Sequence, residues 1–424
     1  MRMTKYSILA AAITALAAGA AHADVTLSIL IDNGPETTAS LDALSKAYTA
    51  KHPDVSFDVE QRAGGSEGDN IIKTRLATGE MADIFQYNTG SLFQALKPEQ
   101  TLADLSDLPS QAGILDSFRK VVTSADGHVR GIPFGPAMGG GIFYNRKIYA
   151  DLGLTPPKTW AEFMANSTKI KAAGKVAIAQ TYGDTWTSQL FILADYYNLQ
   201  AEVPNFAANY TANKAKYATT PAATRSFEHL EQVAKAGFFN ADFGAATMDE
   251  GMRMVATGEA AHYPMLTLGI GNLQQNLPDN LQDIGFFAEP GEDATKNGLT
   301  IWMPAALYVS AKTAHLEEAK KFVDWVGTKE ACDIMAKAVP SGPYLVKGCE
   351  LPKDIPAVVT DMLPYFETDG RTAPALEFLS PVKGPSLEQI TVEVGSGIRS
   401  AKDAVALYDR DVEKQAKQLG LPNW

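Results

Sequence analysis

The alternation of strand-like and helix-like segments near the start of the chain restricts its fold more than any other feature. Patterns typical of buried or half-buried strands occupy Val25–Ile31, Asp54–Glu60 and Ala82–Tyr87. A helix pattern separates the first two strands, and a second helix pattern, which ends at Gly79, separates the last two. Strands that alternate with helices in this way build a mostly parallel sheet covered by helices, so we expect an α/β fold.

A second α/β region follows. Thr159 stands three residues before Glu162 after two prolines, which predicts a helix start with a capping box. Residues 175–186 run from a buried strand into a polar and aromatic loop, and residues 298–313 predict one or two strands. Residues 315–326 predict an amphipathic helix with an inward face. That face comprises Ala319, Phe322, Val323 and Val326. Loops at the carboxyl ends of strands bind ligands in open α/β sheets, so two such sheets predict a cleft between two domains.

The first 23 residues have the pattern of a secretory signal peptide. Arg2 and Lys5 precede an apolar stretch at Ile8–Ala18, and Ala21–Ala23 has the small-x-small form of a cleavage site. The apolar run is shorter than the roughly 20 residues that a membrane-spanning helix needs. Cleavage is predicted just before Asp24, and no cysteine directly follows the cleavage site, which argues against a lipid anchor. We therefore expect a soluble protein that is exported to a bacterial periplasm.

The charge and composition exclude some partners. The formal net charge is −12, and it becomes −14 without the signal peptide, which carries two basic residues and no acidic one. An acidic chain without a basic run is a poor ligand for nucleic acid. A content of 46% hydrophobic residues over 424 residues is sufficient for a large core and favours two domains.

Cys332 and Cys349 are the only cysteines, and both lie in one short segment. In an oxidising compartment we expect them to form a disulfide. That bond would close a loop of 17 or 18 residues and would contribute about 3 kcal/mol in the loop-entropy model. Two free buried thiols are the alternative, and two cysteines alone are too few for a zinc site.

Six stretches of this sequence share the order and character of a known family. They are residues 51–60, 64–90, 143–163, 182–191, 309–331 and the helical region after Ser386. On these stretches the chain resembles the extracellular solute-binding family 1, the sugar-binding receptors of bacterial ABC importers. The resemblance is strongest to the branch that includes glucose and mannose receptors.

The resemblance implies a two-lobed fold that closes on a ligand like a hinged clamp. Three crossings between the lobes would fall near Pro133–Gly140, Thr300–Trp302 and Pro340–Pro343. The lobes would then comprise residues 24–133 with 302–339, and residues 134–301 with 340–424. An inner-membrane ABC permease is the implied partner, and we expect a monomer without cofactor or metal.

The same resemblance places ligand contacts in loops that face the cleft. On this sequence those loops hold Asp32, Asn33, Glu36, Asn88, Thr89, Asp184, Trp186, Trp302 and Tyr344. Glu36 and Asn88 match contact positions of the glucose-type branch best. Glu36 has an alternative role as a carboxylate at a helix N-terminus, Asp32 as the cap of the following turn, and Trp186 as a packing residue between lobe elements.

Departures from the branch leave the ligand open. Glucose-type receptors usually have tryptophans at the end of the first strand, where this chain has Leu30–Gly34, and a Gly-Asp-Trp turn where it has Tyr263–Gly269. Two aromatic surfaces that would stack on a sugar ring are therefore expected to be missing. For this reason the resemblance does not imply that glucose is the ligand. A polyol, a polyamine or a glycerophosphodiester is the alternative to a sugar.

The sequence contains one pattern that is typical of a catalytic site. Gly64–Gly68 fits Gly-x-Ser-x-Gly, the nucleophile pattern of serine hydrolases, with Ser66 as the nucleophile. The partner histidine would have to come from His128, His229, His262 or His315, none of which lies in a distinctive motif. We favour a flexible glycine-rich loop at the rim of the cleft. Motifs for nucleotide, dinucleotide, zinc-protease and calcium sites do not occur in the sequence.

Overall fold

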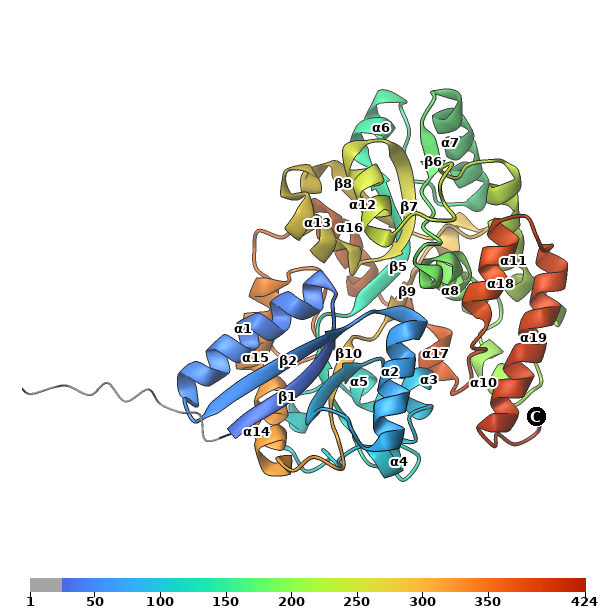
Figure 1. The fold of residues 1–424 in the computed structure, drawn as a ribbon. Helices are drawn as coiled ribbons and strands as arrows, with labels where there is room; N and C mark the ends of the chain where they lie inside the picture. The colour runs from blue at the N-terminus through green and yellow to red at the C-terminus, as the bar shows by residue number, and fades with distance from the viewer. Residues whose placement is uncertain (1–24) are drawn as a thin grey trace, which may run out of the picture.

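The computed structural model describes residues 25–424 as two α/β lobes, drawn one above the other in Figure 1. The predicted signal peptide lies outside the described residues. The lower lobe in Figure 1 contains a five-stranded sheet, and the upper lobe contains a six-stranded sheet. The predicted two-lobed α/β fold is confirmed.

The first sheet has the strand order β2-β1-β3-β10-β4. β1 runs parallel to β2 and β3, whereas β10 runs antiparallel to β3 and β4. The strands are β1 (Val25–Asp32), β2 (Val55–Arg62), β3 (Ile84–Tyr87), β4 (Gly131–Phe134) and β10 (Ala305–Val309). The three strands predicted from the start of the sequence are thus the parallel half of this sheet.

The helices of the first lobe cover both faces of its sheet. The crossovers β1-α1-β2 and β2-α2-β3 run in opposite directions along the sheet, so right-handed connections place α1 and α2 on opposite faces (Figure 1). The predicted stop at Gly79 is confirmed, because Gly79 caps α2 in the left-handed conformation with φ of 81°. The helices are α1 (Pro35–Lys51), α2 (Gly65–Thr78), α3 (Ser91–Gln94), α4 (Pro98–Thr101), α5 (Asp116–Val121), α14 (Leu316–Val326) and α15 (Lys329–Ala338). The predicted inward residues of α14 are all fully buried.

The second sheet has the order β11-β9-β5-β7-β6, and β8 also pairs with β5. β8 and β9 pair with consecutive parts of β5, so they lie end to end along one side of that strand. The strands are β5 (Met138–Asn145), β6 (Val176–Ile178), β7 (Ala260–Leu266), β8 (Ile284–Ala288), β9 (Leu299–Trp302) and β11 (Thr372–Pro374).

The helices of the second lobe come from two distant parts of the chain. The earlier ones are α6 (Arg146–Asp151), α7 (Trp160–Ala172), α8 (Leu190–Ala194), α9 (Tyr196–Glu202), α10 (Phe206–Thr211), α11 (Pro221–Lys235), α12 (Met248–Thr257) and α13 (Gly269–Asn276). The later ones are α16 (Ala357–Glu367), α17 (Leu376–Leu379), α18 (Leu387–Gly395) and α19 (Ala401–Gln418). α18 and α19 pack on α11 at the right of Figure 1. The capping box of Thr159 and Glu162 forms at the start of α7, as predicted.

Three connections join the lobes. The chain passes from β4 to β5 through residues 135–137 and from β9 to β10 through residues 303–304. Tyr344 and Val346 pack in the first core, and Leu351 packs against the cores of both lobes. The third connection therefore lies near Leu351, after the predicted Pro340–Pro343. The limits assigned to the two lobes stay a prediction.

A disulfide joins Cys332 of α15 to Cys349, 17 residues later. Cys332 is fully buried in the first core, and Cys349 packs against that core. The bond therefore holds residues 339–349 on the first lobe, next to the third connection.

We predict that replacing both cysteines, Cys332→Ala with Cys349→Ala, lowers the free energy of unfolding by about 3 kcal/mol, because the unfolded chain gains the freedom of the opened loop. Urea unfolding under non-reducing conditions measures this loss. Wild-type protein in dithiothreitol is the control and should unfold at a similar midpoint. A change below about 1 kcal/mol would contradict the prediction.

Candidate functional site

The carboxyl ends of the parallel strands form the edge of the first lobe that faces the second lobe. The register pairs Asp32, the last residue of β1, with Arg62, the last residue of β2. Gln86 of β3 links them: its Nε2 donates to Asp32 Oδ2 at 2.9 Å, and its Oε1 accepts from Arg62 Nη2 at 3.2 Å. Asp32 Oδ1 also accepts from the backbone N–H of Gly34 at 2.9 Å. Asp32 therefore has the turn-capping role that the sequence offered as its alternative, and it fixes Gln86 as well.

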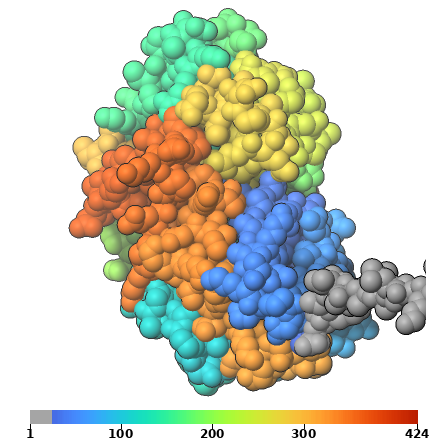
Figure 2. Space-filling view, turned by 90° about the vertical axis from the view of Figure 1, so that its left-hand side faces the viewer, coloured from blue at the N-terminus to red at the C-terminus, as the bar shows by residue number. Residues whose placement is uncertain are grey.

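Glu36, in the first turn of α1, reaches the second lobe. Its Oε1 accepts from the backbone N–H of Gly271 at 3.1 Å, in the first turn of α13. In Figure 2 the yellow segment that contains α13 rests on the blue N-terminal segment. The carboxylate thus lies at a helix N-terminus, but this helix belongs to the other lobe. The residue as a whole keeps partial exposure.

The surroundings of Glu36 disfavour its charged form. Burial raises the pKa of its carboxyl group to about 8, and the nearby charge of Asp32 acts in the same direction. The Gly271 N–H and Ser341 oppose this rise but do not cancel it. Glu36 is therefore largely protonated at neutral pH, and it can donate as well as accept hydrogen bonds.

We predict a pH-dependent difference in stability between the wild type and Glu36→Gln. The folded protein keeps the Glu36 proton up to about pH 8, whereas the unfolded chain releases it near pH 4.5. The stabilisation is complete below pH 4.5 and is lost as pH rises towards 8. The melting temperature of the wild type minus that of the variant should fall over this window and stay constant above it. Scanning calorimetry measures both curves, and parallel curves would contradict the prediction.

A second contact between the lobes involves Glu388 of α18. Its Oε2 accepts from Ser66 Oγ of the first lobe at 3.2 Å and from Thr185 Oγ1 of the second lobe at 2.9 Å. Beside it, a Cβ on Gly65 would lie 3.5 Å from Cδ1 of Trp186. The glycine-rich segment is therefore the first turn of α2 and touches the other lobe, and Trp186 packs between lobe elements while part of its ring stays exposed.

Ser66 has a carboxylate as its hydrogen-bond partner, and the four candidate histidines lie elsewhere. His128 pairs with Asp104, and His315 pairs with Asp83. His229 and His262 are buried in the second lobe at 1% and 0% exposure. The Ser-His contact that a serine hydrolase needs does not form among residues 25–424.

A third contact lies at Gly90, directly after the predicted site loop. Gly90 has φ of 68°, and a Cβ at this position would lie 2.6 Å from the carbonyl oxygen of Glu377 and 2.7 Å from Cδ1 of Phe378. Both residues belong to α17 of the second lobe. Only glycine lets the two backbones approach this closely.

We predict that Gly90→Ala destabilises the protein more than Gly370→Ala does. Gly370 also has positive φ, 77°, but a Cβ there would meet nothing within 4 Å. Both variants pay the cost of a left-handed residue, about 1 kcal/mol, and only Gly90→Ala adds a clash between the lobes. Urea unfolding measures the difference, and small-angle scattering should show a larger radius of gyration for Gly90→Ala alone. Equal effects of the two substitutions would contradict the prediction.

Three predicted contact residues are buried with their polar atoms bonded to protein. Trp302 Nε1 donates to Glu377 Oε1 at 2.5 Å, and its ring covers Gly140. The Tyr344 hydroxyl donates to Val339 O at 2.8 Å, and Thr89 Oγ1 donates to Pro304 O at 3.4 Å. Their role as ligand contacts stays a prediction.

The other predicted residues keep more access to solvent. Asn33 and Asn88 are exposed, and the Asn88 carbonyl accepts from the Tyr308 hydroxyl at 3.0 Å, which fixes the backbone of its loop. Asp184 is half-buried, and its Oδ2 accepts from the backbone N–H of Met248 at 2.6 Å. Its charge raises the pKa of nearby Asp249, for which burial is the larger cause.

The sequence did not identify a charged cluster beside the same edge. Asp69 of α2 has a raised pKa because it is buried, and Lys73, Arg62 and Lys383 oppose that rise. Arg62 is the last residue of β2, as Asp32 is of β1, so its place at a strand end is a sequence signal that could have identified it. Lys383 comes from the second lobe, more than 300 residues away, and no local pattern identified it.

Comparison with known proteins gives a consistent result. Residues 32–331 match the family described as bacterial extracellular solute-binding protein. The chain is 25% identical over 360 residues to the multiple sugar-binding protein of Streptococcus mutans, and this alignment covers 82% of each chain. It is 23% identical over 314 residues to the melibiose/raffinose/stachyose-binding protein of Bacillus subtilis, covering 72% of this chain and 71% of that one.

Solved structures share the fold. A chitin oligosaccharide binding protein superposes with a TM-score of 0.78 at 21% identity, over 93% of this chain and 99% of the other. A raffinose complex of a solute-binding protein gives a TM-score of 0.73 at 20% identity, over 91% and 99%. Within residues 25–424, each helix is too short or too polar to cross a bilayer.

Proposed function

Because this chain belongs to the bacterial extracellular solute-binding proteins, we propose that it is the periplasmic receptor of an ABC importer. It captures a small carbohydrate between its lobes and delivers it to an inner-membrane permease. The named relatives that bind sugars support this assignment of the ligand class. The protein acts as a receptor and not as an enzyme.

Two contacts between the lobes support the ligand class. Glu36 of the first lobe accepts a hydrogen bond from Gly271 of the second, and Trp186 of the second lobe, which is partly exposed, lies beside Gly65 of the first. Asn88 on the first lobe and Asp184 on the second are the further polar groups that we assign to this site. A sugar presents many hydroxyl groups and a few apolar C–H faces, so its site needs planar polar groups together with an aromatic surface. This set of groups has both.

The charge state of the site favours a neutral ligand over a polyamine. Both Asp32 carboxylate oxygens already accept hydrogen bonds from the protein. Glu36 is largely protonated at neutral pH, and Asp69 is flanked by Arg62, Lys73 and Lys383. On the first lobe, a ligand cation would therefore find little uncompensated negative charge.

Closure of the two lobes is the change by which the permease distinguishes a loaded receptor from an empty one. The direct contacts between the lobes include Glu36 with Gly271, Ser66 with Glu388, and Gly90 with α17. A ligand that contacts both lobes adds free energy only to the closed form, and it shifts the population by that difference. A permease that binds the closed form better would then select the loaded receptor.

A thermal-shift screen of sugars, polyols, amines and phosphodiesters tests the proposal. We expect at least one carbohydrate to raise the melting temperature and to bind with a micromolar dissociation constant, which corresponds to about −8 kcal/mol. Stabilisation by an amine or a phosphodiester, with no shift for any carbohydrate, would overturn the sugar assignment.

With the ligand from that screen, we predict that Asn88→Ala lowers affinity about tenfold, because one hydrogen bond of about 1.4 kcal/mol is lost. The melting temperature of the unliganded protein should change little, since the side chain is exposed. Titration calorimetry measures the affinity. Asn205→Ala, an exposed asparagine before α10, is the control and should bind as the wild type does. Equal affinity of wild type and Asn88→Ala would mean that this loop serves only as a turn.

A further inference from the structure

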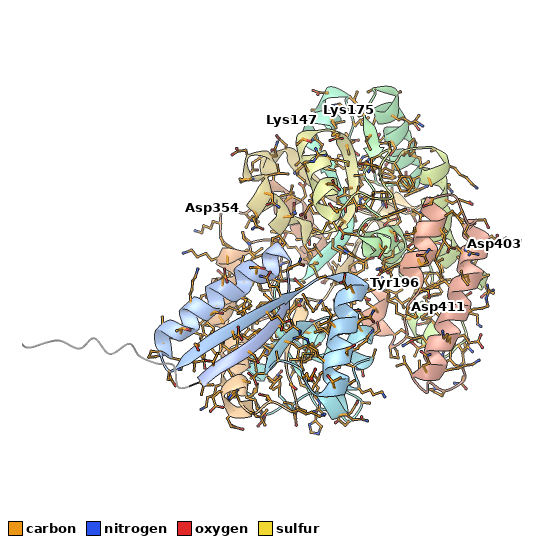
Figure 3. All side chains as sticks on the ribbon, in the orientation of Figure 1. Lys147, Lys175, Tyr196, Asp354, Asp403 and Asp411 are labelled. Carbon is orange, nitrogen blue, oxygen red and sulfur yellow. A yellow bond between two sulfur atoms is a disulfide. The ribbon has the colours of Figure 1, made fainter. Side chains whose placement is uncertain are left out.

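Three ionisable side chains meet in the interior of the second lobe. Asp195 lies between α8 and α9, His229 lies on α11, and Glu289 directly follows β8. They are 3%, 1% and 2% exposed. One ligand atom of each, a ring nitrogen or a carboxylate oxygen, lies within 4.8 Å of the other two. Tyr196, the neighbour of Asp195, is labelled in Figure 3 and packs in the core of this lobe.

Two side chains of this cluster have polar atoms without the partners that buried groups normally have. Both carboxylate oxygens of Glu289 and Nδ1 of His229 have no hydrogen-bond partner among residues 25–424. Buried polar atoms are almost always satisfied, so unsatisfied atoms on two neighbouring ionisable side chains call for an explanation. Two carboxylates beside one imidazole are a common donor set for a divalent metal ion.

We propose that Asp195, His229 and Glu289 bind one divalent transition-metal ion of the zinc class. The imidazole donor favours zinc, nickel or a similar ion over calcium and magnesium, which prefer oxygen ligands. Zinc binds nitrogen and oxygen ligands at about 2.0 to 2.2 Å in tetrahedral geometry, so two ligands of one ion are about 3.3 to 3.6 Å apart. Side-chain shifts of about 1 Å bring ligand atoms that lie within 4.8 Å of one another into that range.

The groups around the cluster orient it for this role. His229 Nε2 faces Glu292 Oε1 at 3.3 Å, and a proton donated along this contact leaves the Nδ1 lone pair available for the metal. The Trp160 ring stacks on the imidazole with centroids 3.7 Å apart and fixes the ring plane. Asn198 Nδ2 donates to Asp195 Oδ1 at 2.8 Å and to the Glu289 carbonyl at 3.1 Å, so it ties two ligands together.

Two protonated carboxyl groups are the competing explanation. Burial raises the pKa of Asp195 to about 7 and also raises the pKa of Glu289. The nearest cation, Arg225, forms its hydrogen bonds with Glu202. Protons would neutralise the carboxyl groups but would leave His229 Nδ1 without a partner in the positions observed, whereas one metal ion satisfies all three groups.

The cluster shares no residue with the contacts between the lobes. It joins the α8–α9 junction, α11 and the end of β8, three segments separated by 30 or more residues in sequence. A metal there would cross-link the second lobe internally. No metal-binding motif predicts this site, because the three ligands do not lie within one short segment of the sequence.

Refolding the full mature chain with and without zinc tests the proposal. Protein unfolded in guanidinium with a chelator, then refolded with Zn²⁺ and passed over chelating resin, should retain one zinc per chain by mass spectrometry. The ion should survive the resin because its ligands are buried, and it should raise the melting temperature by about 3 °C or more. Refolding with Co²⁺ should give visible d–d absorption bands.

Glu289→Gln and Asp195→Asn keep the side-chain shape and remove one ligand charge each, and we expect zinc affinity to fall at least tenfold in both. His128→Gln removes a surface histidine that pairs with Asp104, and should retain the metal. Wild-type protein that holds less than a tenth of an ion per chain would overturn the proposal, and so would equal retention in Glu289→Gln. If Glu289→Gln fails to refold, the cobalt spectrum of the wild type and of Asp195→Asn decides. These readouts do not depend on sugar binding.

Discussion

The parallel pairing of β1 with β2 and β3 is the constraint on which the site depends. The register places Asp32 opposite Arg62, and β3 continues alongside to Tyr87. Because parallel strands end at one edge, three loops that are distant in sequence meet where the second lobe approaches. Gln86 then connects two of these strand ends through its side chain. The polar groups of the first lobe are consequently fixed before any ligand arrives, and only the separation of the lobes remains adjustable.

The second lobe meets this edge with both polar and apolar groups. The N-terminus of α13 lies over Glu36, the carboxylate of Glu388 accepts from Ser66, and α17 lies against Gly90. Phe378 of α17 also packs against the core of the first lobe, so hydrogen bonds and apolar burial both contribute to the contact between the lobes. Each lobe in addition keeps its own apolar core.

Local patterns in the sequence were sufficient to predict the fold. They did not show which residues that are distant in sequence make contact. The glycine cap at Gly79 and the capping box of Thr159 depend on residues at most four positions apart, so they could be predicted. Glu36 was found as a helix-terminal carboxylate, but its partner Gly271 is 235 residues away and belongs to another helix. The resemblance implied a third connection near Pro340–Pro343, but Tyr344 packs on the first core through contacts with residues that are distant in sequence, which local patterns do not show. The Asp195, His229 and Glu289 cluster was missed for the same reason.

The place of β10 in the first sheet has a consequence for how the chain folds. β10 lies between β3 and β4, yet it comes from residues 305–309, after the chain has passed through most of the second lobe. Until that segment is available, β3 and β4 each present an unpaired edge, and the first lobe cannot close its core. Such long-range pairing folds slowly and leaves hydrophobic strands exposed for longer.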